Sequence, residues 1–157
     1  MGGKLAAEIK QTKPFGSLEE EAILNLHRTS SILLQVEMEA LKPHGLSLTQ
    51  YNALRILRGA GPGGLACQEI AGRMIARDPD ITRLLDRLEK RKLIGRVRSS
   101  EDRRVVVTRI TEAGLKLLAS LDGELRQLPK KVLGHLGEKQ LRALVDLLEE
   151  ARSGKGE

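Results

Sequence analysis

Hydrophobic positions recur with helical spacing along the first half of the chain, and turn residues interrupt them. From 17 to 45 the apolar side chains fall mostly on one face and the segment closes with KPHG, which predicts one long helix. A second helix is predicted over 47–58, before the glycine-rich break GAGPGG at 59–64. SLEE and SLTQ, which open these two helices, have the residue spacing of a capping box. A third, shorter helix is predicted over about 66–75, with its inward side formed by Ile70, Ala71 and Met74.

The fourth helical segment separates apolar from polar positions most clearly. Asp78 and Pro79 precede it as a start signal, because proline at the first helical position lacks only an amide that would have no partner there. Its apolar side has the spacing i, i+3, i+4, i+7 and consists of Ile81, Leu84, Leu85 and Leu88. The opposite side is the one that can meet a ligand, and it carries Thr82, Arg83, Asp86, Arg87 and Lys90.

After Ile94 the hydrophobic period changes from helical to extended. GRVR and VVVTRI are typical of strands and SSEDRR between them is typical of a turn, so the sequence predicts a β-hairpin over 95–110. Thr111 can cap a further helix, whose leucine stripe continues until Pro129 disturbs it. A last helix is predicted from one more stripe at i, i+3, i+4, i+7, formed by Leu141, Leu144, Val145 and Leu148.

The two ends of the chain show no clear hydrophobic period. Residues 1–16 finish at a proline and a glycine and are predicted to form a loose arm, while 153–157 are predicted to be a flexible tail. No stretch approaches the roughly 18 apolar residues of a membrane span, and the start lacks the apolar centre of a signal peptide. We therefore expect a cytoplasmic protein that does not engage a membrane.

Charge is distributed unevenly along the chain, and its position is more informative about binding partners than the net charge of +6. Residues 77–104 contain ten basic and six acidic side chains, whereas residues 17–50 contain two basic and five acidic ones. The basic segment suggests an electrostatic footprint for a polyanion, and an ordinary solvated surface is the alternative. With one tyrosine, one phenylalanine and no tryptophan, the chain lacks the aromatic platforms on which single-stranded nucleic acids stack.

Two short helices joined by a turn and followed by a charged hairpin form a winged helix-turn-helix. The fold class is therefore mainly α with a small β-hairpin wing. In such a unit the second helix enters the major groove, about 12 Å wide, and the wing reaches the neighbouring minor groove. Arg103 and Arg104 lie at the predicted wing turn, and Asp102 is placed to hold one of their guanidinium groups by a two-pronged hydrogen bond.

These segments resemble the MarR family of bacterial transcriptional regulators. The matching stretches, in the order and spacing of the family, are GLSLTQYNAL, EIA, ITRLLDRLEKRKLIGR, DRR and ITEAG. The resemblance implies a homodimer that binds pseudo-palindromic promoter DNA as a repressor, with an activator as the alternative. It further implies that a small-molecule effector, or cysteine oxidation in some branches of the family, weakens this binding. It also implies a DNA-binding domain over 47–111 and a helical dimerisation region made of 17–46 and 112–152.

The resemblance carries DNA contacts onto particular residues of this chain. Thr82, Arg83 and Arg87 match the groove-facing side of the recognition helix, and Arg103 and Arg104 match the wing. An ion pair within the helix or with the wing is the alternative for Arg87. The full set of expected DNA-binding residues is Thr82, Arg83, Arg87, Lys90, Arg98, Asp102, Arg103 and Arg104.

Two positions depart from the family's pattern. Lys92 stands where the family usually has glycine, which indicates either a different helix ending or a non-glycine residue in the left-handed region. Ala66 replaces the usual Ser or Thr cap of the third helix, at a cost of about 1 kcal/mol. Asp78 and Asp80 favour the helix dipole but lie near the expected phosphates, where they weaken nonspecific affinity.

Sensor residues are less clearly indicated than DNA contacts. The family's ligand pocket suggests His27, Arg28 and Tyr51 as polar ligand-binding residues. Cys67 is the only cysteine, near the start of the third helix, and is either a redox sensor or a small buried hydrophobic residue. The three histidines have no metal-ligand spacing, so neither a metal nor another cofactor is expected.

Two other function classes compete with a DNA-binding regulator. A winged helix can bind another protein, in which case the basic wing would be incidental. Catalysis has little support, because the chain has no GxSxG motif and its glycine run lacks the lysine and hydroxyl residue of a phosphate loop. The sequence therefore predicts a regulator and not an enzyme.

Overall fold

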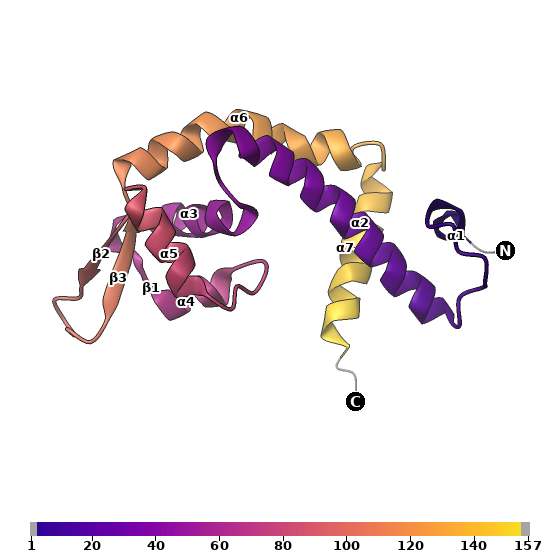
Figure 1. Cartoon of the computed structure of the whole chain (residues 1–157), viewed down its shortest axis with the longest axis horizontal. Helices are drawn as coiled ribbons and strands as arrows, with labels where there is room; N and C mark the ends of the chain where they lie inside the picture. Colours follow the sequence, from indigo (N-terminus) through magenta and orange to yellow (C-terminus); the bar gives the residue numbers. More distant parts are fainter. Residues whose placement is uncertain (1–2, 155–157) are drawn as a thin grey trace. The chain divides into compact units, whose positions relative to one another are not determined.

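The computed structural model describes residues 3–154 and is mainly helical with one small antiparallel sheet (Figure 1). This confirms the predicted fold class of a mainly α chain with a β wing. The chain separates between Glu39 and Ala40 into two compact units. No helix within residues 3–154 is long and apolar enough to cross a membrane.

The N-terminal unit contains α1 (Lys4–Glu8) and most of α2 (Leu18–Leu41). The prediction of a loose arm over residues 1–16 is wrong for 4–8, where α1 forms and buries Leu5, whereas residues 9–16 form neither helix nor strand. Side-chain contacts fasten this short helix. Gly3 donates its amide hydrogen to Glu21 at 3.1 Å, and Arg28 Nε lies 3.7 Å from Glu8 Oε2.

The predicted capping boxes of the first two long helices form to different extents. In α3 (Leu48–Ala60) the box is complete, since Ser47 accepts from the Gln50 amide and the Gln50 side chain accepts from the Ser47 amide, both at 3.1 Å. At the start of α2 Ser17 accepts from the Glu20 amide, but the Glu20 carboxylate turns to the amide of Gly16 instead. A short 3₁₀ turn, η1 (Lys42–His44), follows α2 and ends the long helix as predicted.

Helices α4 (Cys67–Arg73) and α5 (Ile81–Lys90) complete the helix-turn-helix. Ala66 is the N-cap of α4 and has no side-chain acceptor, so one of the two hydrogen bonds of a capping box is missing. Glu69 makes the other one by accepting the Ala66 amide hydrogen at 2.9 Å. Ile70 is buried as predicted, whereas Ala71 is exposed. Helix α5 begins two residues later than Pro79 predicts, with Asp80 as its N-cap.

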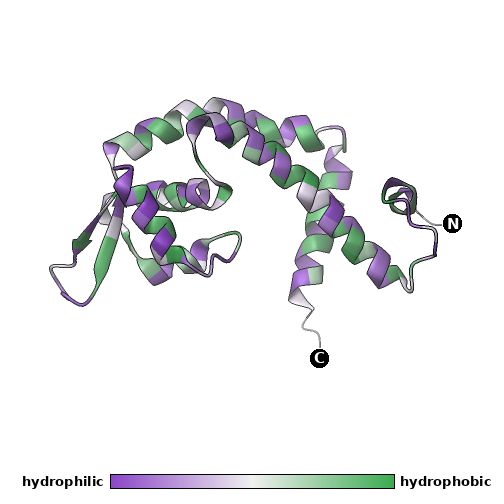
Figure 2. Ribbon diagram, viewed as in Figure 1, coloured by the Kyte–Doolittle hydropathy of each residue, from purple (hydrophilic) through white to green (hydrophobic). Residues whose placement is uncertain are grey.

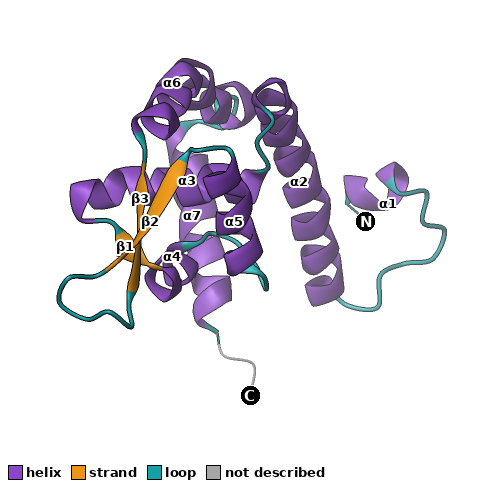
Figure 3. Cartoon of the chain, turned by 60° about the vertical axis from the view of Figure 1, so that its left-hand side comes forward, coloured by secondary structure: helices purple, strands orange, loops and turns teal. Residues whose placement is uncertain are grey.

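Three strands form the sheet in the order β1-β3-β2, where β1 is Leu65–Ala66, β2 is Ile94–Arg98 and β3 is Val106–Ile110. Figure 3 shows this sheet beside α3, α4 and α5. Strands β2 and β3 are the predicted hairpin, and their register pairs Arg98 with Val106 at the base of the wing turn. The sequence analysis missed β1, whose two residues are too few to show a period. A second short 3₁₀ turn, η2 (Gly61–Gly63), precedes it.

Gly64 makes the pairing of β1 possible. Its φ of 68° is a left-handed conformation, and a side chain there would collide with the Thr108 carbonyl. The last residue of the glycine run therefore brings β1 against β3.

Helices α6 (Glu112–Leu133) and α7 (Glu138–Ser153) follow the wing. Thr111 caps α6 as predicted, by accepting from the Gly114 amide at 3.1 Å. Gly114 is required by close approach, because a Cβ would meet the Leu93 carbonyl and Ile110. Pro129, which was predicted to disturb the leucine stripe, lies inside α6, and the helix continues past it to Leu133. Ser153 and Gly154 are the part of the predicted tail that is described, and 155–157 lie outside the described residues.

The core of the second unit is built almost entirely from leucine. Hydrophobic segments of its helices and strands are green in Figure 2, and their buried side chains form one cluster. Burying these side chains supplies most of the stability of the unit and fixes which sides of α5 and the wing point outward. The buried cluster consists of Leu41, Leu46, Ala53, Leu54, Leu57, Leu65, Ile70, Leu84, Leu85, Leu88, Leu93, Ile94, Leu118 and Leu121.

Lys92 joins α5 to β2 in a backbone conformation that favours glycine. Its φ is 59°, and its amide donates to the Glu89 carbonyl while the Leu93 amide donates to the Leu88 carbonyl. These are the paired bonds of a Schellman ending, in which the C′ residue is left-handed. Two alternatives were predicted from the absence of glycine at position 92: a different helix ending, or a non-glycine residue in the left-handed region. The structure shows the second.

Candidate nucleic-acid interface

Helix α5 presents a basic face because its leucine face is buried. Leu84, Leu85 and Leu88 are no more than 5% exposed, so the opposite side of the helix faces solvent. Arg83, Arg87 and Lys90 have the spacing i, i+4, i+7 and are all exposed, so the three cations share one face. Thr82 is exposed beside them.

Arg83 is bound to the residue that caps the helix. One oxygen of Asp80 accepts from the Arg83 amide at 3.2 Å, and its other oxygen lies 3.1 Å from Arg83 Nε. The guanidinium remains largely exposed in this pair. Together with Asp78, Ser47 and Gln50, these side chains line a shallow hollow between the starts of α3 and α5.

Arg87 lines the same hollow. No ion pair or side-chain hydrogen bond joins its guanidinium to any of residues 3–154. The alternative in which Arg87 is held by a helix or wing carboxylate is therefore not found in this structure. Its charge is available to a ligand at this face.

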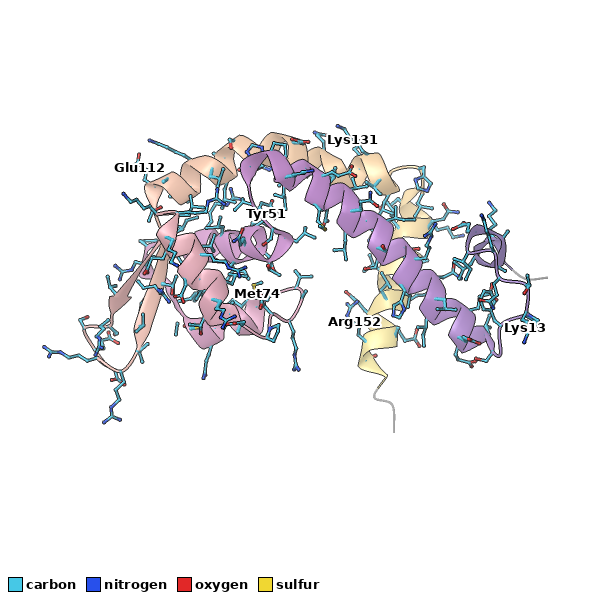
Figure 4. The ribbon with its side chains drawn as sticks, in the orientation of Figure 1. Lys13, Tyr51, Met74, Glu112, Lys131 and Arg152 are labelled. Atoms are coloured by element: carbon cyan, nitrogen blue, oxygen red, sulfur yellow. The ribbon has the colours of Figure 1, made fainter. Side chains whose placement is uncertain are left out.

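The turn of the wing exposes Arg103 and Arg104. Asp102 does not hold a guanidinium, so that prediction is wrong. Its carboxylate accepts from the Arg104 amide at 2.9 Å, and its carbonyl accepts from the Val105 amide at 3.0 Å. Asp102 therefore shapes the backbone of the turn, as acidic residues commonly do two positions before an amide. Side chains project outward from this turn in Figure 4.

Arg96 ties the recognition helix to the wing, a role that the sequence analysis missed. From β2 its Nε donates to Glu89 at 2.8 Å and one Nη donates to Asp86 at 2.5 Å and to Glu89 at 3.2 Å. The hydrogen bonds from Arg96 lower the pKa of the Glu89 carboxyl, and both carboxylates raise the pKa of Arg96. Two acidic residues three apart on α5, followed by an arginine in the next strand, were the available signal.

Arg91 and Arg58 also link separate elements within the second unit. Arg91 donates to the carbonyls of Gly45 and His44 at 2.7 and 3.1 Å, which fastens the end of α5 to the turn before α3. Arg58 on α3 donates to both oxygens of Asp122 on α6, at 2.9 and 3.0 Å. Arg98, at the end of β2, is exposed beside the wing turn.

The predicted sensor residues belong to both units of the chain. His27 and Arg28 lie on α2 in the first unit, and Arg28 faces Glu8. Tyr51 lies on α3 in the second unit, where the guanidinium of Arg55 is 5.7 Å from the centre of its ring (Figure 4). Cys67 is half-buried at the first position of α4 and is a free thiol. In the described part of the chain, no cluster of three or more His, Cys, Asp or Glu residues could hold a metal ion.

A helix-turn-helix whose second helix has an exposed cationic face, followed by a basic hairpin, is the architecture of a winged-helix DNA-binding domain. Comparison with known proteins identifies the type. The family model described as the MarR family matches residues 46–106. The regulator FarR of Neisseria gonorrhoeae is 33% identical over 101 residues, which cover 64% of this chain and 68% of that protein.

Solved structures agree with this assignment. The crystal structure of a MarR transcription factor from Planctomyces limnophilus is 46% identical, with a TM-score of 0.67, over 87% of this chain and 98% of that one. A mutant of MarR from E. coli, solved in complex with operator DNA, shares the fold at 21% identity and a TM-score of 0.76, over 87% of this chain and 99% of that one. The chain belongs to the MarR family of transcriptional regulators.

Proposed function

We propose that this regulator is a homodimeric repressor that acts in the cytoplasm on a pseudo-palindromic promoter site. Helix α5 enters the major groove and presents Arg83, Arg87 and Lys90, with Thr82 beside them. The wing reaches the adjacent minor groove with Arg103 and Arg104, while Arg98 contacts the backbone and Asp102 holds the turn in shape. No catalytic step is part of this proposal.

The observation that carries the proposal is the alignment of open cations on two neighbouring elements. Within residues 3–154, the guanidinium groups of Arg87, Arg103 and Arg104 have no carboxylate partner. Arg96 fixes the strand that leads to the wing against the helix that carries Arg87. Two cationic elements held in a constant relation fit the two adjacent grooves of one duplex.

Apolar side chains left exposed on the first and last helices support a dimer. On α2 these include Ile23, Leu26 and Met38, which are 52%, 44% and 56% exposed. Helix α7 buries no residue fully, and Val145 and Leu147 on it are more than half exposed. Amphipathic helices with an uncovered apolar side are typical of a protein-protein interface. We assign this role to the helices within 17–46 and 112–152, and the DNA-binding role to 47–111.

Release by a small-molecule effector belongs to the same proposal. His27, Arg28 and Tyr51 remain the candidate ligand residues. Their contribution is testable by asking whether His27→Ala or Tyr51→Phe abolishes the response of a known operator complex to an effector found by screening. Cys67→Ser with and without peroxide tests the redox alternative, because a sensing cysteine must lose its response when the thiol is removed.

The first experiment is selection of binding sites from a random duplex pool at two salt concentrations. Wild type is compared with Arg103→Ala/Arg104→Ala and with Lys116→Ala, which removes an exposed cation that pairs with Glu112 on α6. We expect an inverted repeat with half-sites about 10 base pairs apart, relaxed at its A·T-rich flanks in the wing variant only. The logarithm of the affinity should fall linearly with the logarithm of the salt concentration, with a slope of roughly 0.9 per phosphate contacted.

A folded dimer that enriches no sequence would contradict the proposal. If the dimer bound duplex DNA without sequence preference, the repressor function would be contradicted, and only an electrostatic interaction with the DNA backbone would remain. Salt-independent binding to a protein partner, without DNA binding, would favour a winged-helix module for protein-protein interaction.

A further inference from the structure

Asp80 makes two contacts with the same residue. Oδ1 accepts from the Arg83 amide at 3.2 Å, the ordinary geometry of a helix N-cap, and Oδ2 lies 3.1 Å from Arg83 Nε. The backbone and the side chain of Arg83 are thus bound by one carboxylate. Its neighbour Asp78 accepts from the Asp80 amide at 2.9 Å, which holds the capping residue in place.

The pair determines which part of the guanidinium remains available. A guanidinium has five N–H donors in a planar fork, and Nε is the nitrogen paired with Asp80, 3.1 Å from Oδ2. The two Nη groups at the far end are left for another acceptor. This end-on edge matches the spacing of O6 and N7 of guanine, which arginine contacts with two hydrogen bonds in the major groove.

We propose that Asp80 is a positioning residue for base recognition, which holds Arg83 in the orientation that reads a guanine edge. This inference rests on the proposed function and deepens it by assigning a specificity role to an acidic residue. The carboxylate acts through Arg83 and touches no base. An arginine already oriented loses less conformational freedom on binding, so the gain goes to the duplex that offers the matching acceptors.

The negative charge of Asp80 has a second effect of opposite sign. A carboxylate near the phosphates repels every duplex regardless of sequence. The charge of Asp80 therefore lowers the affinity for all duplexes alike, which leaves discrimination unchanged, whereas its contact with Arg83 raises the affinity for the matching base pair and so increases discrimination. Because Arg83 is 78% exposed and Asp80 is 48% exposed, the pair contributes little to folding, and its effect is expected in DNA recognition.

Asp78 provides a matched control for this proposal. Asp78→Asn and Asp80→Asn each remove one negative charge from the same loop, and asparagine keeps an oxygen that can accept an amide hydrogen. Among residues 3–154, Asp78 has no ion pair with an arginine, so only the second substitution affects the Arg83 side chain. Unchanged melting temperatures would show that both variants keep the cap.

The experiment measures the affinity of wild type, Asp78→Asn, Asp80→Asn and Arg83→Ala for the selected operator and for operators with single base-pair changes. Both asparagine variants should bind random duplex more tightly than wild type by similar factors. Asp80→Asn alone should lose roughly five- to tenfold in discrimination at the base pair where Arg83→Ala loses the most. Elsewhere in the site its discrimination should remain as in wild type.

Equal discrimination by the two asparagine variants overturns the proposal. A loss of discrimination in Arg83→Ala that Asp80→Asn does not share overturns the positioning role and leaves the proposed function intact. Unchanged discrimination in Arg83→Ala also overturns it, because Asp80 acts only through that residue. A wild type that selects no operator overturns the proposed function and this inference together.

Discussion

Two groups of arginines in the second unit differ in what their guanidinium groups meet. Arg58, Arg91 and Arg96 donate to carboxylates or carbonyls on other elements and hold the fold together. Arg87 and the two wing-turn arginines make no such bond within residues 3–154. The same residue type is therefore used both to hold α5 and the wing in place and to present open charge on them. Basic charge in the sequence does not separate these uses, because it counts both groups equally.

The largest effect is expected from Arg87, in the open group. Arg87→Ala should weaken operator binding by about 1–3 kcal/mol, roughly 5- to 150-fold, because a bidentate or phosphate contact is lost. Its folding stability should be nearly unchanged, since the side chain has no described partner to lose. Titration of labelled operator and thermal unfolding measure the two quantities. If Lys116→Ala, which removes an equal charge on α6, weakened binding as much, the loss would be one of net charge alone.

Arg96, in the tying group, should show the opposite balance. Arg96→Met removes three hydrogen bonds and leaves Asp86 and Glu89 without their partner, so we expect a loss of about 1 kcal/mol in folding stability. The wing should then lose its fixed relation to α5, which weakens preference at the operator flanks more than at its centre. Chemical denaturation and site selection measure these effects. Equal loss at flanks and centre would contradict the tying role.

Much of this arrangement could be predicted from the sequence, and the part that could not has a physical cause. The leucine period of α5 predicts which side of the helix is buried, and this places Arg83 and Arg87 outward. Periodicity assigns a face to each element separately. It does not show which arginine on one element meets a carboxylate on another, so the tie from Arg96 to α5 was missed.

Turn chemistry marks the second limit of prediction. Asp102 lies in the wing turn as predicted, but its carboxylate accepts a hydrogen bond from a backbone amide and not from a guanidinium. A nearby amide is the closer donor and costs no side-chain entropy, whereas an exposed arginine must be ordered to make the bond.

Lys92 is a basic residue in neither group, since its backbone conformation and not its charge distinguishes it. Lys92→Gly should raise folding stability by roughly 0.5–1 kcal/mol, because glycine occupies the left-handed region without the clash of a Cβ. Operator affinity should stay within about twofold of wild type, as expected where no DNA contact is lost. Lys90→Gly, two residues earlier and inside α5, is the control and should destabilise by about 1 kcal/mol. A destabilised Lys92→Gly would show that the lysine side chain contributes contacts that outweigh the strain.

The smallest expected effect is the pH dependence of the tie between Arg96 and α5. Glu89 has its pKa lowered below the usual 4.5 by hydrogen bonds from Arg96, so it is charged in the folded protein at a pH where it is partly protonated in the unfolded chain. Its stabilising effect is therefore fully present above the unfolded pKa and is lost as pH falls through the folded pKa. Glu89→Gln should be less stable than wild type at pH 7, and the difference should shrink steadily below about pH 4.5. A difference that stayed constant across this range would mean that the charge of Glu89 does not contribute.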